Sequence, residues 1–166
     1  ERQQEGVFYS EPQEYFTEQM ADVLVLHNPT YGFFDRVPGV GNVGSIGIRN
    51  HLDDHNPRLV VSGHVHEDYG VALRNGTMFL NPSNFGGVDS PYGWQAGGAY
   101  AEVYMEEGHV NQVNIMRLVE DDHKKLMEVR RDGKHLYGEK NPATEEFRHI
   151  DLDMIVRDSS GALLEA

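Results

Sequence analysis

The sequence contains no cysteine, and this absence removes two kinds of protein from consideration. A chain without cysteine forms neither a disulfide framework nor a thiolate metal site, which excludes disulfide-stapled scaffolds and zinc fingers. Histidine and carboxylate side chains are then the strong metal ligands that remain. Any metal chemistry in this protein must therefore be carried by those two residue types.

Basic side chains are also scarce. The 166 residues hold 14 Lys plus Arg against 27 Asp plus Glu, which gives a formal net charge of -13. Such a surface repels long nucleic acid and anionic membranes, so we expect neither as a general partner. No apolar run approaches the ~20 residues of a membrane span, and the first residues do not resemble a signal peptide. We expect a cytoplasmic protein.

The first half of the chain alternates apolar runs with helical and glycine-rich segments. Residues 12–20 have helical spacing and predict a short amphipathic helix, whereas residues 21–27 (ADVLVLH) predict a buried strand. An irregular loop rich in glycine and proline follows over residues 28–44. A helix over residues 45–55 and a second buried strand over residues 58–63 (RLVVSG) come next. This succession predicts a βαβ unit with a parallel sheet.

The second half favours antiparallel strands. Asn75-Gly76 lies between two alternating segments and predicts a hairpin, and a second hairpin is predicted to turn near Glu107-Gly108. Beyond residue 118 the composition becomes more charged, with a further turn at Asp132-Gly133. We interpret residues 1–118 as the body of one domain and residues 119–166 as a β-rich appendage of the same domain.

Three histidines follow the ends of the predicted parallel strands. His27 follows the first strand, and His64 and His66 follow the second. Side chains two residues apart on extended backbone point to the same side, and ligands of open α/β sheets bind at the carboxyl ends of the strands. These residues are candidate metal ligands, although exposed turn histidines are also common. His51 and His55 lie four residues apart on a predicted helix and could share a metal, but a solvated helix face is the favoured interpretation.

Three segments, in order, resemble the calcineurin-like metallophosphoesterase superfamily: DVLVLHNPTYG, GSIGIRNHLDDHNPRLVVSGHVHEDYG and FLNPSNFGG. The resemblance spans about residues 20 to 117 and is to the C-terminal half of that domain, as found in small, uncharacterised bacterial and archaeal phosphoesterases. It implies an α/β fold: the C-terminal half of a four-layer α/β sandwich, here with an antiparallel hairpin extension and a charged C-terminal appendage.

The resemblance also implies a dinuclear centre of two divalent ions, either Mn, Fe or Zn. His27 and His64 would bind one ion and His66 the other. Asn28 and Asn84 are the corresponding candidates for substrate binding. The catalytic residues, including a bridging aspartate, are expected on an N-terminal half that this chain does not display.

Two Asp-X-His matches elsewhere are interpreted as coincidences. Asp53-Asp54-His55 lies in a predicted helix and Asp121-Asp122-His123 in the charged tail, so both occur in the wrong order for the family. We therefore expect the missing half to come from a lost N-terminal segment, a partner chain or a second copy of this chain.

The implied function is metal-dependent hydrolysis of a small phosphomonoester or phosphodiester. Two alternatives stay open. One is a non-catalytic binding or scaffold subunit that keeps the fold. The other is an unrelated enzyme in which His27, His64 and His66 hold a single zinc or iron ion.

Overall fold

A computed structural model describes residues 21–90, 93–133, 135–140, 154–157 and 163–164. The helix predicted over residues 12–20 lies outside this part of the chain. Among the described residues, no helix has the length and apolar character needed to cross a membrane.

The predicted βαβ unit is present. Strand β1 (Val23–Val25) and strand β4 (Leu59–Val61) are parallel neighbours, and helix α1 (Ile46–His55) connects them. The helix begins where expected, because the backbone N–H of Ile48 donates to Ser45 Oγ at 3.2 Å. It ends at Asn56, whose left-handed backbone (φ 40°) closes the last turn.

The hairpin at Asn75-Gly76 is also confirmed. It joins β5 (Gly70–Arg74) to β6 (Thr77–Asn81), and both turn residues have the positive φ (51° and 85°) that a tight hairpin turn of this kind requires. Strand β6 is parallel to β4, so the four strands form one mixed sheet in the order β1-β4-β6-β5.

A second sheet contains six strands in the order β14-β13-β12-β11-β10-β9. Its strands are β9 (Ala99–Glu106), β10 (His109–Val119), β11 (Asp122–Asp132), β12 (His135–Lys140), β13 (Met154–Arg157) and β14 (Leu163–Leu164). The predicted turn at Glu107-Gly108 lies between β9 and β10, and the turn at Asp132-Gly133 begins at the last residue of β11. The domain boundary after residue 118 stays a prediction, although β10 runs across that position and pairs with strands on both sides of it.

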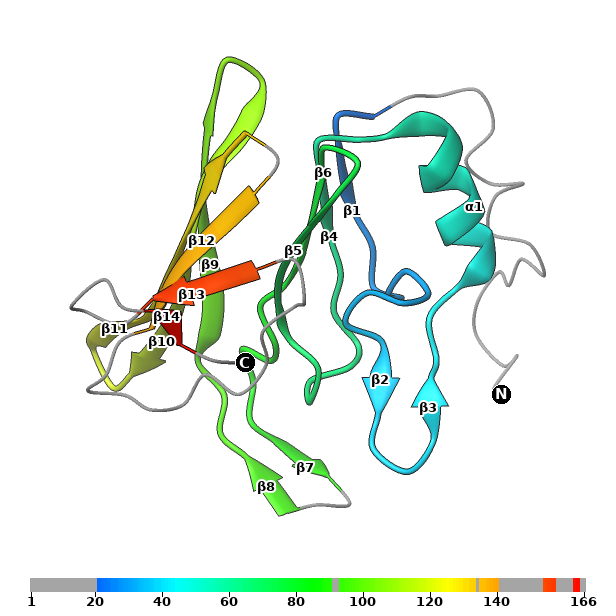
Figure 1. The fold of residues 1–166 in the computed structure, drawn as a ribbon. Helices are drawn as coiled ribbons and strands as arrows, with labels where there is room; N and C mark the ends of the chain where they lie inside the picture. The colour runs from blue at the N-terminus through cyan, green and yellow to red at the C-terminus, as the bar shows by residue number, and fades with distance from the viewer. Residues whose placement is uncertain (1–20, 91–92, 134, 141–153, 158–162, 165–166) are drawn as a thin grey trace.

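The described elements form three layers: α1, the four-stranded sheet and the six-stranded sheet (Figure 1). Successive side chains of β4 point to opposite faces, so the four-stranded sheet packs against a hydrophobic core on each side. Val60 packs with Ile48 and Leu52 of α1, whereas Leu59 packs with residues of the six-stranded sheet such as Ile115. The α/β character therefore rests on the βαβ unit, while most of the described chain is strand. The fourth layer of the expected sandwich is not among the described residues.

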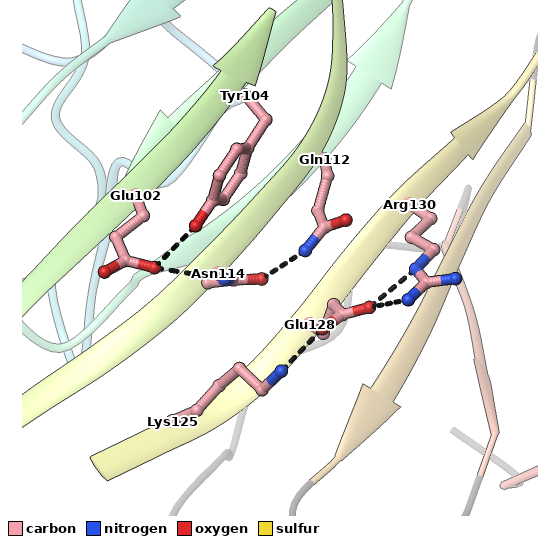
Figure 2. Close-up of polar contacts among 7 residues, drawn as sticks. All are labelled: Glu102, Tyr104, Gln112, Asn114, Lys125, Glu128 and Arg130. Carbon is pink, nitrogen blue, oxygen red and sulfur yellow. Dashed lines mark hydrogen bonds and ion pairs between the residues drawn. The ribbon is translucent and has the colours of Figure 1, made fainter. Parts of the chain in front are cut away.

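The outer face of the six-stranded sheet is polar (Figure 2). On β10, Val113 and Ile115 point inward and are fully buried, whereas Asn114 points outward and donates to Glu102 Oε2 on β9 at 3.1 Å. On β11, Glu128 accepts from Lys125 Nζ at 2.6 Å. The hydrogen bond from Lys125, together with that from Arg130, lowers the pKa of the Glu128 carboxyl despite its partial burial. The polar side chains labelled in Figure 2 therefore form hydrogen bonds and ion pairs with one another.

Strand β1 departs from the prediction of a buried strand. Val23 is 40% exposed and Val25 is 75% exposed, because β1 lies at the edge of its sheet and the six-stranded sheet does not cover it. Leu24, on the opposite face, packs toward the α1 core. Among the described residues, only β4 pairs with β1. Within the described part of the chain, the outer edge of β1 is therefore unpaired.

Two small hairpins project at the end of the molecule where β1, β4 and β6 finish (Figure 1). They are β2 (Arg36–Val37) with β3 (Gly41–Asn42), and β7 (Val88–Ser90) with β8 (Gly93–Gln95). The first corrects our expectation that residues 28–44 lack regular structure. Buried Asp35 organises it, since its carboxylate accepts from Asn42 Nδ2 at 2.6 Å and from the N–H of Gly44 at 3.0 Å.

Candidate metal site at the strand ends

The parallel pairing of β1 and β4 continues beyond both strands and brings the histidines together. The N–H of Leu26 donates to the carbonyl of Val61 at 2.8 Å, and the N–H of Gly63 donates to the carbonyl of His27 at 3.3 Å. These backbone contacts place His27 directly beside His64. Two residues 37 positions apart in the chain thereby share one edge of the sheet.

The two imidazoles contact each other. Nε2 of His27 and Nδ1 of His64 lie 3.1 Å apart, and the rings meet edge to face with centroids 5.0 Å apart. Two imidazole nitrogens bound to one tetrahedral zinc at about 2.0–2.1 Å are separated by roughly 3.3 Å. Both side chains are exposed. The pair therefore has the spacing and the access needed to hold one metal ion.

The structure does not bring His66 into this pair. Within the described part of the chain, no group of three or more His, Asp or Glu side chains is arranged to hold a metal. His66 lines a cavity of about 410 Å³ together with Ser83, Asn84 and Trp94. Its assignment to a second metal stays a prediction. The alternative in which three histidines share one ion requires a cluster of the three side chains, and the described residues do not form one.

The two candidate substrate residues have different surroundings. Asn28 is exposed beside His27. Asn84 is only 8% exposed, and its Nδ2 donates to the carbonyls of Gly86 at 2.7 Å and Ala96 at 3.4 Å. The amide of Asn84 thus connects the segments on either side of hairpin β7–β8, at the wall of the cavity. A role for either asparagine in binding substrate stays a prediction.

Two further polar side chains are buried. Asp68 is 8% exposed, and its Oδ2 accepts from the N–H of Arg36 at 2.9 Å. His51 was interpreted as part of a solvated helix face, but it is 8% exposed and its ring stacks on that of His55 at 4.2 Å. Burial, followed by the neighbouring His55, lowers the pKa of His51.

Sequence reasoning placed Asn81 at a strand end near the candidate site but gave its side chain no role. It is fully buried at the end of β6 and makes three hydrogen bonds to the segment around the candidate site. The available signal was the Asn-Pro-Ser sequence directly after an apolar strand.

Comparison with known proteins found sequence similarity over part of the chain. No family model matches the chain. A 64-residue segment, 37% of the chain, is 41% identical to the human and mouse proteins called metallophosphoesterase domain-containing protein 1. The match spans 20% of the length of those relatives. It supports the resemblance to the metallophosphoesterase superfamily over this segment.

Two solved structures show weaker similarity. Vacuolar Protein Sorting 29 from Cryptosporidium parvum has a TM-score of 0.37 and 22% identity, over 51% of this chain and 44% of that one. Wild-type Vps29 complexed with zinc from Entamoeba histolytica has a TM-score of 0.39 and 16% identity, over 54% and 49% of the two chains.

Proposed function

We propose that this chain contributes part of the active site of a metal-dependent phosphoesterase that hydrolyses a small phosphomonoester or phosphodiester through two divalent ions. The contact between His27 and His64 at the carboxyl edge of parallel strands carries the proposal. The 64-residue match to metallophosphoesterase domain proteins supports the superfamily. The imidazole donors favour Mn, Fe or Zn over Mg.

The described residues fit one ion in part, because they supply two of its ligands. His27 and His64 would hold that ion, and His66 would contribute to the second. Bound divalent ions would supply Lewis-acid activation of the phosphate and of the attacking water. The remaining ligands, including a carboxylate to offset the metal charge, would come from outside the described residues.

We place the source of those ligands against the open edge of β1. Exposed Val23 and Val25 and an unpaired strand edge, both seen in the described residues, favour addition of a further strand. A strand paired in parallel with β1 would end beside His27, at the same edge of the sheet. The proposed occupant is the other βαβ half of the domain, on a partner segment or a second copy.

The proposed substrate is small because the surface disfavours polyanions. The net charge of -13 repels duplex DNA, whereas one phosphate group can be bound by the metals themselves. The cavity of about 410 Å³ beside His66 would accommodate the rest of a small ester.

Zinc titration of the full chain tests the proposal. We expect the wild-type chain to bind zinc, and we expect His27→Ala and His64→Ala to weaken binding by at least about ten-fold, since each removes a ligand. His109→Ala is a matched control, because His109 is also exposed but lies at the start of β10, where its Nδ1 faces Arg58. Equal zinc affinity in all four proteins would contradict the metal site and would favour a non-catalytic role.

A further inference from the structure

The segment that carries His64 and His66 has no regular structure of its own. It connects β4 to β5 over residues 62–69, and His64 adopts a left-handed backbone conformation with φ 69°. This conformation is disfavoured for a residue with a Cβ atom and persists only where surrounding contacts impose it. The geometry of the histidines must therefore be imposed from outside the segment.

Asn81 supplies most of that constraint. Its side chain is 0% exposed, and its Nδ2 donates to the carbonyl oxygens of Val65 at 2.7 Å and Asp68 at 2.8 Å. Its Oδ1 accepts from the N–H of Ser83 at 2.9 Å. Both amide protons and the amide oxygen are thus in use. Only a side chain with two donors on one nitrogen matches two carbonyl acceptors at this position.

Ser83 binds a further carbonyl of the same segment. Its Oγ donates to the carbonyl oxygen of His66 at 2.8 Å, so the carbonyls of residues 65, 66 and 68 are all bound by side chains at or just after the end of β6. Between the histidines, Val65 is 2% exposed and anchors the segment in the interior. The segment is held at its backbone and at Val65, while the imidazole of His64 contacts His27 and His66 lines the cavity.

We propose that Asn81 and Ser83 are positioning residues that set the orientation of His64 and His66 for metal binding. The inference rests on the proposed function above, but it concerns residues to which neither the family resemblance nor the comparisons assign a role. The two side chains act on the backbone of the segment rather than on the metal. Their removal should lower metal affinity without deleting a ligand.

Asn81→Asp and Ser83→Ala test the proposal. Asn81→Asp keeps the size of the side chain but directs a carboxylate oxygen at two carbonyl oxygens, so both hydrogen bonds are lost. We expect zinc affinity to fall by about ten-fold or more, as for other residues that orient metal ligands, and by less for Ser83→Ala. Thr77→Ala is the control, because Thr77 is buried at the opposite end of the same strand.

Histidine ring NMR without metal provides the second measurement. In both variants we expect the ring signals of His64 and His66 to shift or split, while those of His109 stay unchanged. If Asn81→Asp does not fold, Ser83→Ala decides alone. Variants with wild-type ring signals would overturn the proposal, as would wild-type zinc affinity. If the wild-type chain binds no zinc, the proposed function is wrong, and the ring signals still decide whether Asn81 and Ser83 position the histidines.

Discussion

At the scale of single residues, His51 links stability to pH. Its pKa lies below the ordinary value of 6.5 because burial disfavours the charged ring and His55 adds repulsion, while Asp54 acts weakly in the opposite direction. As the pH falls below 6.5, the unfolded chain therefore takes up a proton at His51 before the folded chain does. The free energy of unfolding should decrease as the pH falls through this range.

His51→Gln provides the comparison. Between about pH 7.5 and about pH 5, the wild-type chain should lose more of its free energy of unfolding than the variant, measured by urea denaturation. Asn50→Gln serves as the control, since Asn50 is exposed on the same helix and carries no titratable group, so the wild-type dependence should be unchanged. Identical pH dependence in wild type and His51→Gln would show that burial of His51 does not govern this response.

At the scale of the element, the start of α1 depends on one hydroxyl. Ser45 Oγ accepts from the N–H of Ile48, whereas the backbone of Ser45 bonds separately to Pro29 and Tyr31. Ser45→Ala therefore removes the cap and keeps the loop contacts. We expect a loss of about 1 kcal/mol in the free energy of unfolding. Asn50→Ala, at an exposed position within the helix, should cost nothing, so an equal loss in both variants would argue against capping.

At the scale of the whole molecule, the described residues present only part of the proposed metal site. His27 and His64 supply two ligands, and the described part of the chain shows no group of three or more His, Asp or Glu side chains arranged to hold a metal ion. We therefore expect the purified chain to hydrolyse small chromogenic phosphomonoesters and phosphodiesters at background rates, with Mn²⁺ or Zn²⁺ present. Turnover several orders of magnitude above background by a monomer would contradict this and return attention to Asp53, Asp54 and Asp121.

The sequence by itself determined the local elements of this protein. The hairpins at Asn75-Gly76 and Glu107-Gly108 were predictable because both turns need positive φ, which few residue pairs adopt readily. The helix was predictable because Ser45 can cap it and Asn56-Pro57 ends it. In each case the responsible atoms lie within a few residues of one another, so no knowledge of the fold was needed.

Tertiary structure alone decided which of these elements are covered and which side chains meet. The apolar run of β1 predicts a buried strand, but sheet order places β1 at an edge where Val25 is exposed. The contact between His27 and His64 was predicted in outline from the strand ends, yet its distance depends on the register of two strands. The burial of His51 and the bonds of Asn81 were not predictable, because they depend on partners brought together only when separate segments pack.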